Sequence, residues 1–160
     1  LDLSGLKLDP SVVVQFVSAQ PNLEVLNLSN MDRVLNDELM MTLLSNIPLL
    51  RDLNLASNQA ITVKTIESMS NFTPQLESLV LADCHGLSRY HTAIQRLKRL
   101  RHLNIRYAHP PKHHCISVNQ FSQIPSLVTC ACHKNASVKK PLHALPISPE
   151  ILVAKLPQSQ

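Results

Sequence analysis

Leucine recurs in a fixed pattern along the chain. Residues 23–30 read LEVLNLSN, residues 50–58 read LRDLNLASN, and residues 76–84 read LESLVLADC. These stretches fit the pattern LxxLxLxx[N/C], and residues 100–108 repeat it with Ile105 in the third apolar position. Because the second and third apolar positions are two residues apart, their side chains point to the same face of a short strand. The pattern therefore predicts strands at residues 24–28, 51–55, 77–81 and 101–105.

A proline two residues before the first leucine carries the pattern further. It stands at three of these copies and again before Leu127 and Ile151. From those residues the chain reads LVTCACHKN and ILVAKLPQS, so weaker strands are expected at 130–132 and 154–156. The opening LDLSGL ends an earlier copy, with a strand at residues 1–3. The first positions lie 27, 26, 24, 27 and 24 residues apart, which indicates about seven repeats.

The stretches between these copies show apolar residues at helical spacing. They predict helices within residues 9–21, 36–48, 62–72 and 88–99. Asp9 is a candidate N-cap with Pro10 at the first helical position, and the prolines at 21, 48 and 74 end the first three helices. Each unit thus reads strand, turn, helix, turn. Since no unit can bury its apolar face alone, neighbouring units must stack.

This pattern resembles the leucine-rich repeat over essentially the whole chain, in its ribonuclease-inhibitor-like and cysteine-containing types. The resemblance implies an α/β fold: a curved right-handed solenoid with a parallel sheet on the concave face and helices on the convex face. The Asn or Cys position turns the chain and can bond the loop backbone. Leu6, Met31 and Ala108 occupy that position in their copies, so a continuous ladder of asparagines is not expected.

The repeats also define the expected domain organisation. We expect a single leucine-rich repeat domain over residues 1–160, as a fragment of a longer protein, because Leu1 falls inside a copy. Residues 1–108 form regular repeats. Residues 109–160 form degenerate repeats, and partial disorder is the alternative for them.

Charge is distributed unevenly between the two halves of the chain. Residues 1–80 carry four Lys/Arg and nine Asp/Glu, a net charge of −5, whereas residues 81–160 carry eleven and two, a net charge of +9. All eight histidines fall in the second half. Such an asymmetry favours a charged partner for one half. The alternative is that both halves only carry solvated charges.

Several kinds of chemistry find little support in the sequence. Two glycines in 160 residues argue against glycine-rich phosphate loops, and the apolar runs are too short to span a membrane. His113, His114 and Cys115, with the CACH stretch at 130–133, suggest zinc, but the repeat assigns Cys130 and Cys132 to core positions. We therefore expect buried thiols, no metal and no cofactor. Without a GxSxG motif or a Ser–His–Asp grouping, we expect no enzyme.

A stack of repeats with an extended surface is typical of protein-binding modules. The resemblance extends to the substrate-recognition arms of F-box and VHL-box receptors of cullin-type ubiquitin ligases, and an inhibitor or scaffold is the alternative. Unpaired cysteines favour a reducing compartment, the cytoplasm or nucleus. Nucleic acid is a further alternative for the basic half, although aromatic residues for base stacking make up only 3% of the chain. No membrane or small-molecule partner is expected.

The expected binding surface lies between the buried positions of the later strands. Those residues point to the concave side, and the candidates are Arg101, His102, Asn104, Arg106, Tyr107, His133 and Lys134. Arg and Tyr are frequent interface hot spots. We expect Arg106 and Tyr107, flanked by His102 and His133, to contact an acidic segment of a protein partner. The alternative is a solvated basic rim.

Overall fold

The computed structural model describes residues 1–87, 89–108, 124 and 126–131. Within them, helices and strands alternate along the chain. The elements are α1 (Pro10–Ser18), β1 (Val25–Asn27), α2 (Asp37–Asn46), β2 (Asp52–Asn54), α3 (Val63–Phe72), β3 (Ser78–Val80), α4 (His91–Ile94), β4 (His102–Asn104) and β5 (Thr129–Ala131).

The strands form one parallel sheet in chain order, β1-β2-β3-β4-β5. Its register aligns the second apolar positions, so that Leu53 pairs with Leu26 and Leu79, and Leu103 pairs with Cys130. Asp2 makes a parallel bridge to Asn27, which extends the same register to the first copy. The strands predicted at residues 24–28, 51–55, 77–81 and 101–105 are confirmed. The one expected at 154–156 lies outside the described residues.

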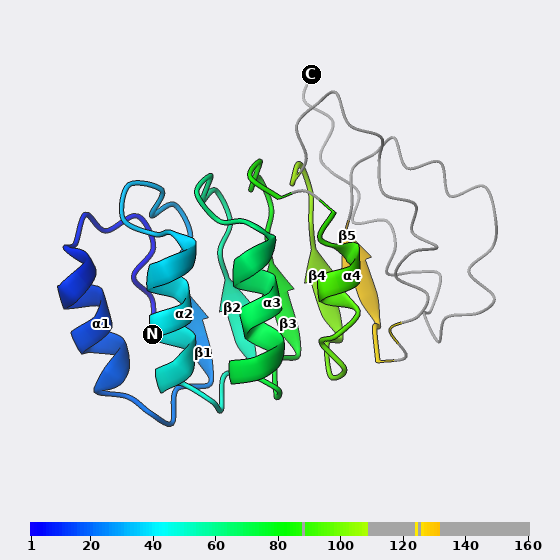
Figure 1. Cartoon of the computed structure of the whole chain (residues 1–160), viewed down its shortest axis with the longest axis horizontal. Helices are drawn as coiled ribbons and strands as arrows, with labels where there is room; N and C mark the ends of the chain where they lie inside the picture. The colour runs from blue at the N-terminus through cyan, green and yellow to red at the C-terminus, as the bar shows by residue number, and fades with distance from the viewer. Residues whose placement is uncertain (88, 109–123, 125, 132–160) are drawn as a thin grey trace, which may run out of the picture.

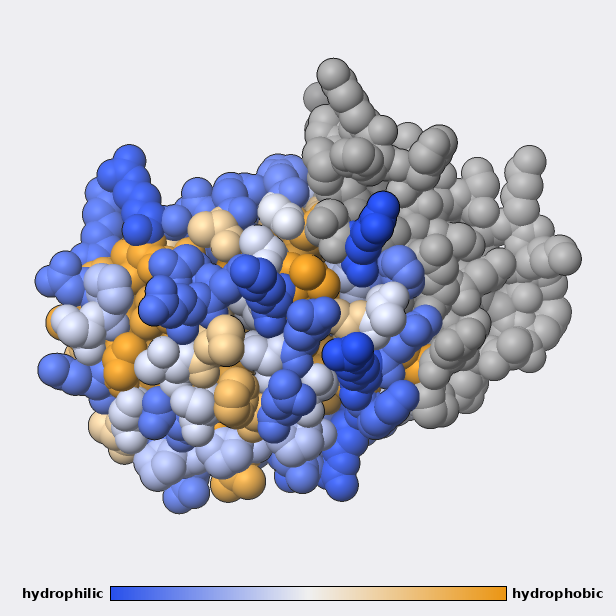
Figure 2. Space-filling model, in the orientation of Figure 1, coloured by the Kyte–Doolittle hydropathy of each residue, from blue (hydrophilic) through white to orange (hydrophobic). Residues whose placement is uncertain are grey.

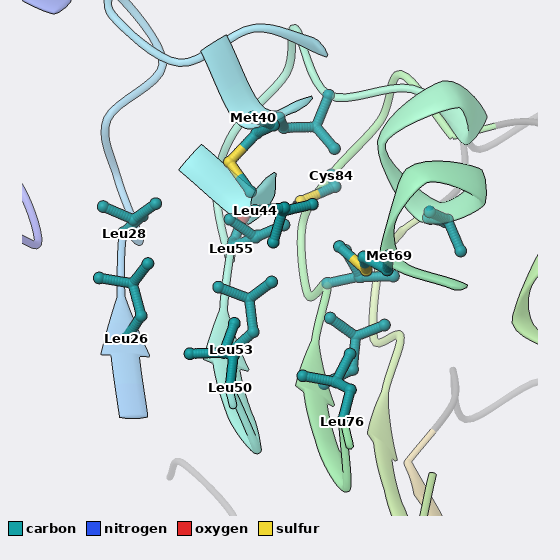
Figure 3. Packing of buried hydrophobic residues seen from close by; sticks show 14 of the residues in the cluster. Leu26, Leu28, Met40, Leu44, Leu50, Leu53, Leu55, Met69, Leu76 and Cys84 are labelled. Carbon is teal, nitrogen blue, oxygen red and sulfur yellow. Dashed lines mark hydrogen bonds between the residues drawn. The ribbon is translucent and has the colours of Figure 1, made fainter. Parts of the chain in front are cut away.

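The helices lie side by side on one face of this sheet (Figure 1). The leucines of each repeat point from the strands toward the helices, where Met40, Leu44 and Met69 meet them (Figure 3). Most of these side chains are fully buried. Full burial of a leucine contributes roughly 1.5–3 kcal/mol, so the repeated leucines supply the main stabilising contribution. Burial of the alternate positions explains why the pattern predicted the sheet.

The helix-covered side is also the side seen in the space-filling view. It shows a mosaic of hydrophilic and hydrophobic residues over the described elements (Figure 2). The exposed apolar side chains include Phe16 of α1 and Met41 of α2. No helix among the described residues is long and apolar enough to cross a membrane.

Two of the helices begin with a side-chain cap. Asn36 accepts a hydrogen bond from the backbone N–H of Leu39 at 2.8 Å, and Thr62 accepts one from that of Lys64 at 3.3 Å. Asp9 is the N-cap residue of α1, as expected, but its side chain makes no capping bond. Pro10 at the first helical position presets the backbone there without it.

The helix predicted within residues 88–99 is much shorter than expected. Only His91–Ile94 are helical, and the chain then continues in tighter turns, with Arg96 N–H bonded to Ala93 O and Leu97 N–H to Ile94 O. The physical reason is the length of this repeat. Leu76 and Leu100 are 24 residues apart, against 26 for the repeat before, which leaves less chain for the helix. Tyr90, Ile94 and Leu97 are buried nonetheless, as their spacing predicted.

The fourth position of the pattern turns the chain inside the stack. Asn58 is fully buried; its amide donates to the carbonyl oxygens of Leu28 and Leu55, and its carbonyl oxygen accepts from Met31 N–H. Cys84 takes the same place one repeat later and donates its thiol to Leu55 O at 3.1 Å. The expected backbone-bonding role is therefore confirmed at both residues. Leu6 differs, since it is 46% exposed.

Candidate functional site

The candidate residues lie on β4 and on the turn that follows it. His102 and Asn104 flank the buried Leu103, so both point away from the helices, and His102 is exposed. Arg106 is half-buried and Tyr107 is 53% exposed, directly before the buried Ala108. The structure therefore brings the candidates of the fifth repeat together along one strand and its carboxyl end.

Asn104 sets the direction of the chain at this turn. Its side-chain oxygen accepts a hydrogen bond from the backbone N–H of Arg106 at 3.2 Å. Asn54 does the same for Ala56 at 3.0 Å, and Asn27 for Ser29 at 3.1 Å. This is the local turn that Asn and Asp favour. Asn104 therefore supports the position of Arg106, which is a more specific role than the general surface residue expected from the sequence.

Tyr107 adopts a backbone conformation that a bulky residue rarely takes. Its φ is 56°, in the left-handed region. The equivalent positions of the earlier repeats also have positive φ, but they hold Gly5, Asn30, Ser57 and Asp83. Gly and Asn are the residues that tolerate this region best, whereas a side chain such as Tyr is strained by about 1–3 kcal/mol. Local strain of this kind concentrates at functional sites.

The charged residues that precede neighbouring strands alternate in sign. Arg51 lies 3.6 Å from Glu24 and 3.5 Å from Glu77, and Arg101 lies 4.0 Å from Glu77. These contacts are exposed, so each is worth little, but they compensate part of the charge of Arg101. Arg106 is different: among the described residues no carboxylate lies within 4 Å of its guanidinium. Its positive charge is therefore the stronger attraction for an anionic ligand.

The opposite end of the same face carries negative charge. Asp2 accepts hydrogen bonds from the backbone N–H of Ser4 at 2.9 Å and from the side chain of Asn27 at 3.1 Å. Hydrogen bonding from the side chain of Ser4, followed by that from its backbone N–H, is the main cause that lowers the pKa of Asp2 below its usual value. Asp2 is thus charged at neutral pH, and the face runs from acidic at Asp2 and Asp52 to basic at β4.

Other expectations concern residues near β5 and the possibility of a metal site. His133, Lys134 and Cys132 lie outside the described residues. Cys130 takes the predicted place opposite Leu103 and packs against the core, but it is only half-buried rather than fully buried. Within the described residues, no group of three His, Cys, Asp or Glu side chains is placed to hold a metal ion.

A further group of cations, not among the candidates expected from the sequence, lies before the start of β4. Arg96, Lys98 and Arg99 are all exposed on the turn between α4 and the strand. One signal could have identified them. Lys98 stands two residues before Leu100, where the other copies have Pro21, Pro48, Pro74, Pro125 and Pro149.

Comparisons with known proteins concern the fold. No protein-family model and no curated protein match the chain. Among solved structures, the chain is similar to TLR13 in a complex with ssRNA13, with 25% identity, a TM-score of 0.57 and coverage of 77% of this chain. The chain spans only 16% of that protein.

A second similar structure is the tropomodulin C-terminal domain of Caenorhabditis elegans, with 15% identity, a TM-score of 0.56 and coverage of 78% of each chain. The actin-binding site 2 of leiomodin-1 is 16% identical over 84% of this chain and 70% of that one, with a TM-score of 0.43. With the parallel sheet, its register and its buried leucines, the likenesses to TLR13 and to the tropomodulin domain support a fold of the leucine-rich repeat type.

Proposed function

We propose that this chain is a non-enzymatic protein–protein interaction module that binds an acidic segment of a partner through Arg106 and Tyr107. His102 and Asn104 border this contact on β4, and Arg101, His133 and Lys134 extend it. The observation that carries the proposal is the strained and exposed Tyr107 beside Arg106, whose charge no carboxylate among the described residues compensates within 4 Å. The same turn in other repeats uses residues that suit its backbone better.

The backbone strain at Tyr107 calls for a compensating role of its side chain. A bulky side chain held at positive φ lowers stability, and an exposed ring returns little of that free energy through burial. Tyr and Arg side chains, however, contribute most strongly to binding free energy when a partner covers them. An acidic segment would form charge-assisted hydrogen bonds with Arg106 and cover the ring of Tyr107.

The test uses an eight-residue oligoglutamate labelled with a fluorophore, followed by anisotropy at low ionic strength. We expect the double variant Arg106→Glu/Tyr107→Asn to bind at least tenfold more weakly than the parent. Asn is chosen because Asn30 adopts the same conformation in an earlier repeat. The variant should therefore melt at the same temperature as the parent or higher, since the strain is relieved.

A matched control reverses a charge on the helix side. Lys64→Glu changes an exposed residue of α3 and should leave binding within twofold of the parent. If the folded double variant bound oligoglutamate as the parent does, the contact site would lie elsewhere. If the control weakened binding as much, the attraction would come from net charge alone.

The more specific part of the proposal is an intracellular role as the substrate-recognition arm of a cullin-type ubiquitin ligase. Cys84 in the turn position and the 24–27-residue period support it, because both are features of the cysteine-containing repeats that this chain resembles. The test is affinity purification of the full-length parent protein. Recovery of a cullin with its adaptor supports this role, and their absence from a complex that retains other partners contradicts it.

Binding of single-stranded RNA is a second candidate function. The net charge of +9 in residues 81–160 and the likeness to a protein whose structure holds ssRNA13 favour it. An oligouridylate of eight nucleotides in the same anisotropy measurement separates the candidates. RNA binding that weakens steeply with salt and exceeds oligoglutamate binding would favour this candidate.

A further inference from the structure

The turn before β4 departs from the rule that the other turns follow. At the position two residues before the first leucine, Pro21, Pro48 and Pro74 each begin a two-residue turn. Lys98 holds this position in the fifth repeat, and Arg99 follows it. Proline at a compatible turn stabilises a protein by restricting the unfolded chain, so lysine at this position forgoes that stabilisation. Such departures from a local rule are expected at functional positions.

The exposed cations of this turn have uncharged neighbours. Arg99 donates a hydrogen bond to the side-chain oxygen of Gln75, and Lys98 donates to the backbone oxygen of Gln95 at 3.0 Å. Among the described residues, no carboxylate lies within 4 Å of Arg96, Lys98 or Arg99. The turn therefore carries three positive charges that the described residues leave uncompensated.

The backbone of the turn is held in place by the next repeat. Ser126 donates its hydroxyl to the carbonyl oxygens of Lys98 and Leu100, both at 2.8 Å. Leu97 and Leu100 are buried on either side of the two cations. A charged group on a fixed backbone loses less conformational entropy on binding than one on a mobile loop. The turn is thus organised to present Lys98 and Arg99 to a ligand.

This turn and the proposed Arg106–Tyr107 contact lie at the two ends of the same strand. Four residues lie between Arg101 and Arg106, and a fully extended chain would span at most about 17 Å over this interval. Exposed His102 lies between them. Resting on the function proposed above, we propose that the acidic segment lies along β4 and that Lys98 and Arg99 bind its far end. An extended segment of about six residues is needed to contact both ends.

An acidic polypeptide fits this surface better than a nucleic acid does. Tyr107 is exposed at one end of the strand, and between it and Arg99 the exposed or half-exposed residues are Arg101, His102, Asn104 and Arg106. Unspecific binding of single strands usually relies on several aromatic residues that stack with successive bases. An extended peptide with carboxylates at alternate residues can bind to a row of cations and does not require aromatic residues.

The test transfers the preceding turn into this repeat. The variant Lys98→Pro/Arg99→Gln reproduces Pro74–Gln75, and no described backbone oxygen accepts a bond from the N–H of Lys98 that proline would remove. We expect it to melt no lower than the parent. Binding of the eight-residue oligoglutamate should weaken at least fivefold, while binding of a three-residue oligoglutamate, too short to span the strand, stays within twofold.

The outcomes separate this inference from the proposed function. If Lys98→Pro/Arg99→Gln bound the long probe as the parent does while Arg106→Glu/Tyr107→Asn did not, the inference would fail and the proposed function would stand. If proline disturbed the fold, Lys98→Gln/Arg99→Gln would test the same charges. Lys7→Gln/Lys64→Gln removes as many exposed charges elsewhere and should change nothing. Preference for an eight-nucleotide oligouridylate over oligoglutamate would overturn the inference in favour of nucleic acid.

Discussion

At the scale of single residues, the turns at Asn58 and Cys84 depend on what one side chain can donate. The amide of Asn58 donates to two carbonyl oxygens at 2.8 and 2.9 Å and also accepts from Met31 N–H. Cys84 has one weak S–H donor, so it can satisfy Leu55 O but cannot accept strongly in return. Unsatisfied buried backbone groups cost about 1–3 kcal/mol each. This cost explains why Asn or Cys recurs at the position.

The buried thiol of Cys84 gives a prediction about reactivity. Burial raises its pKa to about 11 from 9.0, and the thiolate is the reactive form. We expect the thiol of Cys84 to react with a disulfide reagent at neutral pH only on unfolding, so Cys84→Ala should have one slowly reacting thiol fewer than the parent. Since the folded pKa is raised, the contribution of Cys84 to stability is constant below pH 9 and falls as pH rises toward 11.

The loss of stability above pH 9 is tested by comparing thermal melts of the parent with those of the same Cys84→Ala variant. Cys84→Ala has no thiol at this position, so its stability should fall less between pH 9 and 11 than that of the parent. Fast reaction of all four thiols in the native protein would contradict the burial of Cys84.

At the scale of elements, Asp37 connects two neighbouring helices. It lies in the first turn of α2, and its carboxylate accepts from the Thr62 N–H at 2.9 Å and from the hydroxyls of Thr62 and Thr65, each at 2.6 Å. These groups belong to the start of α3. Burial by itself raises the pKa of Asp37, but the hydrogen bonds from Thr62 and Thr65 outweigh it and lower the pKa below 3.8.

This arrangement predicts a pH-dependent contribution to stability. Because the folded pKa of Asp37 is lowered, its contribution is present above the unfolded value near 3.8 and is lost as pH falls through the folded value. Asp37→Asn should lower the free energy of unfolding by about 1–3 kcal/mol at pH 7. The difference from the parent, measured by urea denaturation, should shrink below pH 4. Glu38→Gln in the same turn is the control, and an equal loss there would refute the role of Asp37.

The elements also show how far the sequence pattern can predict structure. Strands β1 to β4 and helices α1 to α3 were predictable, because a period of two or of 3.6 residues determines which side chains are buried. The one-turn α4 was not, since helical spacing at Tyr90, Ile94 and Leu97 does not reveal how a shorter repeat closes. Positive φ at Tyr107 and the ion pair of Arg101 with Glu77 depend on neighbouring repeats, so only the structure could locate them.

At the scale of the whole molecule, stability comes from contacts between repeats. Each helix packs against the next, and each strand pairs only with its neighbours. A repeat that loses its core therefore also removes one side of two interfaces. The same arrangement gives the face opposite the helices its gradient of charge, because each strand contributes one row of side chains from the acidic β2 to the basic β4.

Leu53→Asp tests this dependence at the centre of the described sheet. Leu53 is 2% exposed and pairs with Leu26 and Leu79, so the substitution places a carboxylate between two strands without a described partner for it. Burial of an unpaired charge costs several kcal/mol, a large share of the 5–15 kcal/mol that stabilise a domain. We expect the loss of cooperative thermal unfolding at pH 7, followed by circular dichroism.

Asn54→Asp is the matched control, since it introduces the same carboxylate one residue further along β2. Its side chain lies on the face opposite the helices, half-exposed, where Asp2 already fills the equivalent position in the first copy and accepts the N–H of Ser4 at 2.9 Å. This variant should melt close to the parent, because a carboxylate can make the same bond to Ala56 that Asn54 makes. A stable Leu53→Asp protein, or an unfolded Asn54→Asp protein, would show that the two faces of the strand are assigned wrongly.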